Sequence, residues 1–437
     1  MPRFVIEQST DPIIGFAGLA MIGEMADACK LDHATKHRES PNTAFKDSDI
    51  LRTMVGLMAL GKTSFDQVRQ YRDDEHFAAC LGIGSVPSAE SLRLRLEAMS
   101  TDERLANALP DCSRLLWKAA HMLPDTLELG KRTWVRLDGD VTVMDNGQTA
   151  KEGVSRAYDG RDGYAPLFFH LGGGWIVSAH LRPGSAHSLH EGTQDLLAQA
   201  VGKARRMTGM RVLTVLDAGF DAADTLATLS RPGNDFIVKH NPRSTPQGRW
   251  FDLAVAHGRE ESPRPGKRVW LGSVLREVEG LKAPVRMVFE VVERTSRKGR
   301  DLLVPERTAC VLWTSLDAPE EVVLDWYRRR GESEQYHAEF KGEMDLERLP
   351  SGKFAVNSLF FQLGVLAYNM LRVMGGELVS DRRLGLRKAT RRRIRTVIQD
   401  VMYRCARVVR HARRLLLRIR GPRAWVDAFE RIQMRLA

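Results

Sequence analysis

Apolar residues recur along this chain with two different spacings, and the change between them divides the sequence. In the first part they return every three or four residues, as in 47–61 (DSDILRTMVGLMALG) and 88–99, a spacing that predicts amphipathic helices. An Asp or Ser begins each of these segments, as is typical of a helix N-cap. We therefore expect residues 1–130 to form an N-terminal domain of short packed helices.

Beyond this point, alternating and β-branched segments predict strands. The expected elements are, in order, a strand at 133–144, a hairpin at 166–181, a helix at about 189–207, a strand at 211–216, a helix at about 222–229 and a strand at 236–239. This order predicts an α/β fold in which a mixed sheet has helices packed on it. The segment that follows is polar and alternating, which predicts a β-rich insertion.

These patterns divide the chain into five parts. They are the helical domain 1–130, a first core segment 131–240, the insertion 241–316, a second core segment 317–375 and a basic helical tail 376–437. We expect no membrane-spanning helix, because the longest apolar stretches, near 13–23 and 358–371, are shorter than the roughly 20 residues that a span requires. The five cysteines lie far apart without a C-x-x-C pair, which favours a reducing, intracellular compartment.

The positive charge of the chain is concentrated at its end. The formal net charge is +11, yet 381–437 alone contains eighteen Lys and Arg residues against four Asp and Glu. A localised basic segment is typical of a surface that binds a polyanion, and Arg in particular suits phosphate oxygens. We therefore expect the tail to contact phosphate and the N-terminal helices to contact DNA. The alternatives are a solvated arginine-rich helix for the tail and a purely structural bundle for the N-terminal helices.

Two sites in the predicted sheet place carboxylates where they could carry chemistry. Strand alternation puts Asp138 and Asp140 on one face, among residues that otherwise look buried, and buried carboxylates are rare unless they are paired or bind a cation. Asp217 ends an apolar strand and precedes Gly219, a common position for a site residue. The alternatives are a carboxylate that caps a turn for the first pair, and a helix N-cap for Asp217.

A third acidic residue lies in a segment with regularly spaced polar side chains. In WYRRRGESEQYHAEFKGEMD, Tyr327, Arg330, Glu334 and Lys341 are offset by 0, 3, 7 and 14 residues. On an α-helix these positions fall within roughly 60° of one another, so one helix face is expected to carry a phenol, a guanidinium, a carboxylate and an ammonium group. An ordinary salt bridge between Arg330 and Glu334 on a solvated face is the alternative.

This segment resembles the Y-R-E-K signature, Tyr-x2-Arg-x3-Glu-x6-Lys, of bacterial insertion-sequence transposases of the DDE type. Further similarities are an Asp-x-Thr on the first strand, an Asp followed by Gly-Phe after the later strand, and an Ala-Tyr-Asn in a late apolar helix. In this chain these are Asp140 with Thr142, Asp217 with Gly219 and Phe220, and Ala367 with Tyr368 and Asn369. The resemblance covers about residues 47–374.

The resemblance implies an RNase H-like core with flanking helices and a β-strand insertion between the second aspartate and the glutamate. It implies that Asp140, Asp217 and Glu334 are the catalytic residues and the metal ligands. Asp138 is the alternative first aspartate. Two Mg²⁺ ions are expected, with Mn²⁺ able to substitute, since hard cations prefer carboxylate oxygens. Tyr327, Arg330 and Lys341 would contact DNA phosphates, according to the same resemblance.

The expected function is that of an insertion-sequence transposase, which binds terminal inverted repeats and performs metal-dependent DNA cleavage and strand transfer. Its partners would be double-stranded DNA, as transposon ends and as target, and a second copy of the chain in a synaptic complex. The expected location is the nucleoid in a bacterial cytoplasm, without a membrane. Two alternatives remain: a noncatalytic DNA-binding protein derived from a transposase, and a metal-dependent nuclease of the same fold.

Overall fold

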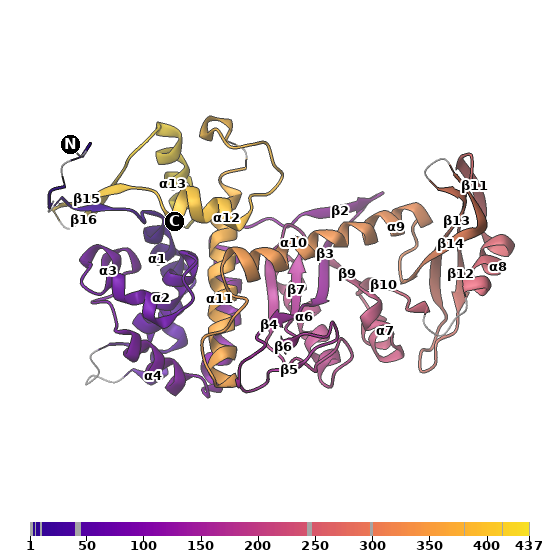
Figure 1. Ribbon diagram of the computed structural model, residues 1–437, viewed down its shortest axis with the longest axis horizontal. Helices are drawn as coiled ribbons and strands as arrows, with labels where there is room; N and C mark the ends of the chain where they lie inside the picture. Colours follow the sequence, from indigo (N-terminus) through magenta and orange to yellow (C-terminus); the bar gives the residue numbers. More distant parts are fainter. Residues whose placement is uncertain are drawn as a thin grey trace. The chain divides into compact units, whose positions relative to one another are not determined.

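A computed structural model describes residues 3–4, 6–8, 11–39, 45–242, 247–297, 300–379, 381–412 and 414–436. The chain forms two compact units, each of which is described here by itself (Figure 1). Unit 1 comprises Met1–Met122, Ala150–Glu152 and Ala338–Ala437, and unit 2 comprises Leu123–Thr149 and Gly153–His337. The expected helical domain and the last hundred residues therefore belong to one unit, a division that differs from the five parts expected above.

The core of unit 2 is a mixed sheet. Its strands are β2 (Thr126–Leu129), β3 (Arg132–Val141), β7 (Leu167–Leu171), β8 (Ile176–His180), β9 (Arg211–Leu216) and β10 (Asp235–Lys239). They lie in the order β10-β9-β3-β7-β8, and β2 pairs with β3. β3, β9 and β10 are parallel, whereas β7 is antiparallel to β3. With its helices α6 (Thr193–Thr208) and α7 (Ala223–Leu229), this sheet confirms the predicted α/β fold class.

The insertion continues the same sheet. It contains α8 (Gln247–His257), β11 (Arg259–Arg264), β12 (Lys267–Arg276), β13 (Val285–Arg297) and β14 (Arg300–Thr314). β14 pairs with both β13 and β10, so the inserted strands extend the sheet sideways from the core (Figure 1). The three short strands β4 (Met144–Asp145), β5 (Ser155–Arg156) and β6 (Asp162–Tyr164) form a separate small sheet.

The register of the core strands places the carboxylates. Asp138 of β3 is opposite Val215 of β9, and Gly139 is opposite Leu216, the last residue of β9. Since β3 and β9 are parallel, the residues that follow this register on each strand, Asp140 and Asp217, come to the same edge of the sheet. The apolar pattern of the two strands thus fixes the neighbourhood of both aspartates.

Unit 1 is built around a long apolar helix, α11 (Phe354–Gly376). The helices of its N-terminal part are α1 (Gly18–Ala28), α2 (Asp47–Ala59), α3 (Glu75–Leu81), α4 (Ala89–Met99) and α5 (Glu103–Ala119). By length and composition α11 could cross a membrane, which the sequence pattern did not indicate, but 78% of its most apolar window is buried within the protein. It is accordingly a core helix, against which α2 and α5 pack; α2 is labelled beside it in Figure 1.

The basic C-terminal segment is not the helix that its composition predicts. After α12 (Ile394–Val397) it forms a hairpin of β15 (Ala406–His411) and β16 (Arg414–Ile419), and only then α13 (Arg423–Leu436). β15 also pairs with β1 (Ile13–Ile14) near the N-terminus. The helical prediction is wrong for the hairpin because ARVVRH and RLLLRI contain β-branched and apolar residues that pack as strands.

One buried carboxylate in unit 1 pairs with an arginine of the basic C-terminal segment. Glu339 has no exposed surface, and Arg391 donates to both of its carboxylate oxygens at 2.7 and 2.6 Å. Tyr368 donates a hydrogen bond to it at 3.2 Å, and an Nη1 atom of Arg372 lies 3.7 Å away. Arg391 of the basic segment therefore serves to hold the fold of unit 1.

We expect Glu339→Ala to lower the free energy of unfolding by about 3–5 kcal/mol, because it leaves buried guanidinium groups without their carboxylate. The shift of the urea midpoint relative to the wild type measures this loss. Glu103→Ala, which changes an exposed Glu at the start of α5, is the matched control and should stay within about 0.5 kcal/mol. Equal midpoints for the two variants would contradict the structural role of Glu339.

Candidate active site

A guanidinium group joins the two aspartates at the edge of the core sheet. The Nη2 atom of Arg330 lies 2.8 Å from Oδ1 of Asp140 and 3.7 Å from Oδ2 of Asp217. The same nitrogen donates a longer hydrogen bond of 3.4 Å to the carbonyl of Gly139. Three residues far apart in the sequence, each singled out by pattern or resemblance, are thus brought together. All three are partly buried, so their charges interact strongly.

The two aspartates differ in their electrostatic environment. Burial would raise the pKa of Asp140, but contact with His337, whose Nε2 lies 3.4 Å from Oδ2, and with Arg330 outweighs burial and lowers this pKa. The pKa of Asp217 is raised, because burial exceeds the opposing effect of Arg330. Asp140 is consequently the more firmly ionised member of the pair.

Asp138 lies in a different environment from its neighbour two residues along β3. Its side chain is completely buried, and Arg136 donates from Nε to its Oδ2 atom at 2.9 Å. Arg136 also donates from Nη2 to Glu332 at 2.7 Å. Burial raises the pKa of Asp138 to about 6. Asp138 is therefore part of an ion-pair network inside unit 2, and Asp140 is the one that shares Arg330 with Asp217.

Glu334 stands apart from this pair. It lies in α10 (Glu332–Ala338) with its side chain exposed, and its carboxylate makes no hydrogen bond or ion pair to any residue that the structure describes. Within the same described residues, no three His, Cys, Asp or Glu side chains are grouped so that they could hold a metal ion. Two of the three predicted ligands, Asp140 and Asp217, do offer the hard oxygen donors that such an ion prefers, and these donors converge on one cationic nitrogen.

The four-residue stripe does not lie on one continuous α-helix, so this part of the prediction is wrong. α9 (Glu320–Arg328) ends before a 3₁₀ turn at Arg329–Gly331, and α10 is followed by a π-helical turn at Glu339–Glu343. A glycine at the centre of the segment weakens helix propensity there.

The other members of the stripe are placed as follows. Tyr327 packs against the core cluster around Trp326, and burial raises its pKa to about 12. Lys341 lies in the π-helical turn, which belongs to unit 1.

His337 is a site residue that the sequence analysis missed. Only 4% of its surface is exposed, and its ring makes edge contacts with Phe168 and His170, at centroid distances of 5.1 and 5.2 Å. It supports Asp140, because its Nε2 lies 3.4 Å from Oδ2 of that carboxylate. Its offset of seven residues from Arg330 corresponds to about two helical turns. This spacing was the signal in the sequence that could have identified His337 as a site residue.

A cavity of about 460 Å³ opens beside Asp217. The residues that line it include Val141, Tyr158, His187, Ser188, Asp221 and Asn241. Asp221 holds its wall in place, because it accepts hydrogen bonds from Trp313 of β14 at 2.9 Å and from the backbone of Asn241 at 2.7 Å. The insertion is thereby tied directly to the loop that carries Asp217.

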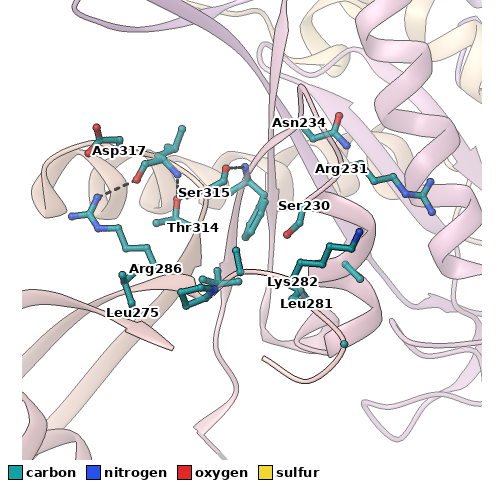
Figure 2. Close-up of a pocket in the computed structure, with 17 residues that line it drawn as sticks. Ser230, Arg231, Asn234, Leu275, Leu281, Lys282, Arg286, Thr314, Ser315 and Asp317 are labelled. Atoms are coloured by element: carbon teal, nitrogen blue, oxygen red, sulfur yellow. Dashed lines mark hydrogen bonds between the residues drawn. The ribbon is translucent and has the colours of Figure 1, made fainter. Parts of the chain in front are cut away.

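Neither of these carboxylates lines a second cavity, of about 600 Å³, whose lining residues are drawn in Figure 2. It lies at the start of β10, whereas Asp217 follows the end of the parallel strand β9, so the two lie at opposite edges of the sheet. Ser230, Asn234 and Lys282 line it, and Arg286 donates at 3.1 Å to the carbonyl of Leu316 on its wall. Because it lies at the opposite ends of these strands, this cavity is not part of the carboxylate site.

We expect Gly139→Ala to disturb the carboxylate pair. A Cβ atom at this position would lie 2.5 Å from Cδ2 of Leu216 and 2.9 Å from Cε1 of Phe169, both fully buried. Overpacking of this kind costs about 1–3 kcal/mol and pushes β3 away from β9. The melting temperature measures this loss of stability and should fall in Gly139→Ala. Gly248→Ala is the control, because a Cβ atom at that position would have nothing within 4 Å. A melting temperature unchanged in both variants would contradict the close packing described here.

Nearly the whole chain matches a known protein family. The family model described as "Transposase DDE domain group 1" matches residues 11–437. No curated protein matches the sequence. Among solved structures, the chain is similar to a piggyBac transposase in a synaptic complex with hairpin DNA, at 10% identity and a TM-score of 0.43, over 89% of this chain and 80% of that chain. Since the family model spans nearly all of its residues, the protein belongs to the DDE transposase family and is a DNA transposase.

Proposed function

We propose that this transposase acts on the ends of a bacterial insertion sequence, through a metal site formed by Asp140, Asp217 and Glu334. The observation that carries the proposal is the shared contact of Asp140 and Asp217 with one nitrogen of Arg330. Two carboxylates that converge on a guanidinium group make a position where a compact divalent cation is favoured as well. The Y-R-E-K spacing around Glu334 supports the assignment of the third ligand.

The cofactor is proposed to be Mg²⁺, with two ions at the site and Mn²⁺ able to replace them. When bound, such ions activate the attacking oxygen and stabilise the leaving oxygen of a phosphodiester. Asp140 is suited to hold a cation at neutral pH because contact with His337 and Arg330 favours its ionised form over the effect of burial. Glu334 is exposed, so its carboxylate is free to turn toward the two aspartates.

Arg330 has two tasks in this proposal. While it contacts both aspartates, its positive charge offsets the repulsion between them. It must give up at least one of these contacts before Asp140 and Asp217 can share a metal ion, and its fork of donors is then available to a DNA phosphate. Tyr327 and Lys341 would bind neighbouring phosphates, so the three residues position the DNA rather than react with it.

The proposed partners are double-stranded DNA, as transposon ends with terminal inverted repeats and as target, and a second copy of the chain in a synaptic complex. The helices of residues 1–130 would contribute DNA contacts. The proposed location is the nucleoid in a bacterial cytoplasm. The basic charge of the C-terminal segment is consistent with a polyanionic partner.

Cleavage assays with the element's own ends test the three catalytic residues. In Mg²⁺, Asp140→Ala, Asp217→Ala and Glu334→Ala should each reduce nicking by at least about a hundredfold, because each removes charge stabilisation of the transition state. Their affinity for the ends should change little. Asp138→Asn, which keeps the shape of the neighbouring buried side chain, is the matched control and should retain activity.

The alternatives give different outcomes in the same assays. A Glu334→Ala variant that still nicks would contradict the third ligand. Cleavage by the wild type without joining of a pre-cut end would favour a nuclease of the same fold. Salt-sensitive binding without any turnover would favour a noncatalytic DNA-binding protein.

The double role of Arg330 predicts opposite effects on metal binding and on catalysis. Arg330→Gln removes the cation that competes for Asp140 and Asp217, so Mn²⁺ should bind about tenfold more tightly, since charged hydrogen bonds contribute about 1.5–3 kcal/mol. Strand cleavage should nevertheless fall. Mn²⁺ titration followed by electron paramagnetic resonance measures the affinity without DNA. Weaker Mn²⁺ binding in Arg330→Gln would show that this residue supports the metal site instead of competing with it.

A further inference from the structure

The hairpin of β15 and β16 carries a strongly basic outer face. Residues directly opposite each other in the register share one face of a two-stranded ribbon, and three such pairs point outward. They are Arg407 with Arg418, Val409 with Leu416, and His411 with Arg414. The partly or fully buried Ala406 and Val408 occupy the other face. We refer to the three outward pairs as the basic hairpin face.

The like charges on this face do not stabilise the fold of the hairpin. Arg407 and Arg418 lie directly opposite each other, and like charges in this arrangement destabilise a strand pair. No Asp or Glu occurs between Asp400 and Asp427. Among the described residues, Arg407 has one carboxylate nearby, Asp11 at 3.8 Å, whereas Arg414 and Arg418 form no hydrogen bond or ion pair through their side chains.

Several other arginines of the basic segment, unlike those of the basic hairpin face, are occupied by contacts within unit 1. Arg391 binds Glu339, and Arg423 binds both Asp427 and Glu430. Arg404, just before β15, stacks on the ring of Trp425 at 3.8 Å. These contacts neutralise or pack the three guanidinium groups of Arg391, Arg404 and Arg423 within unit 1. By contrast, Arg414 and Arg418 on the basic hairpin face are exposed and form no such contact among the described residues, and Arg410 and Arg420 nearby are exposed as well.

We infer that the basic hairpin face is a DNA-binding ribbon that contacts phosphates of double-stranded DNA. The inference rests on the proposed function, because it assigns a surface to the DNA partner named there. A two-stranded β-ribbon fits the major groove of B-DNA or can follow its backbone, and Arg forks suit phosphate oxygens. Bound phosphates would also remove the repulsion between Arg407 and Arg418, which explains why a costly pair of like charges is present.

Salt dependence of binding tests this inference. Fluorescence anisotropy with a labelled 30-base-pair duplex of arbitrary sequence, between 50 and 300 mM KCl, gives the slope of log K against log salt. Each lost phosphate contact reduces this slope by about 0.9. Arg414→Gln with Arg418→Gln should therefore reduce it by about 2 and weaken binding by tenfold or more at 150 mM salt.

Arg423→Gln is the matched control, because it removes the same charge from an exposed arginine that already has acidic partners. It should leave the slope unchanged. Arg418→Gln should not lower the melting temperature, since it relieves repulsion, whereas loss of a structural arginine would lower it. Equal slopes for the double variant and the wild type would overturn the inference. In a parallel assay with vesicles that contain anionic lipid, a loss of binding by the double variant to these vesicles but not to duplex DNA would also overturn the inference.

The outcomes also separate this inference from the proposed function. If the wild type neither binds duplex DNA nor cleaves transposon ends, the proposed function itself fails. If the wild type binds and cleaves, but the double variant has the wild-type slope, only the role of the hairpin is overturned.

Discussion

Compensation of charge at the sheet edge is the constraint on which the rest of this structure depends. Asp140 and Asp217 follow neighbouring parallel strands, so the fold itself brings two carboxylates together, and they repel each other unless a cation lies between them. In this structure Arg330 supplies that cation, with one nitrogen 2.8 Å and 3.7 Å from the two side chains. A metal ion would satisfy the same requirement, which makes the edge suited to phosphodiester chemistry.

The surrounding elements all serve to keep that edge in register. Gly139 lets β3 approach β9 and β7 closely, since no larger residue fits between Leu216 and Phe169. The break between α9 and α10 places Arg330 in a turn from which it reaches the carboxylates. The insertion contributes as well, because Trp313 of β14 donates a hydrogen bond to Asp221 in the loop that follows Asp217.

Local patterns in the sequence predicted much of this arrangement. Alternation and apolar runs indicated the core strands, because each strand is buried over most of its length, and of the four residues in the stripe only Arg330 contacts the two aspartates. The pattern could not show the 3₁₀ turn around Arg330, since helix offsets assume a regular helix. His337 escaped notice because its partners, Phe168 and Asp140, come from distant strands.

Other features depended on packing between distant segments and could not be read locally. Charge count favoured a helical tail, yet residues 406–411 and 414–419 pair as the two strands of a hairpin, and β1 pairs with β15 at its edge. Likewise α11 joins the N-terminal helices rather than the sheet, since it is apolar on nearly all sides and requires burial throughout its length.

The most direct test of the central claim is a crystal structure with Mn²⁺, in which anomalous scattering locates the metal without reference to activity. The account predicts a peak between the carboxylates of Asp140 and Asp217, with Glu334 turned toward it and Arg330 moved away from at least one aspartate. A peak beside Asp138, or an Arg330 that keeps both contacts while Mn²⁺ binds elsewhere, would contradict it.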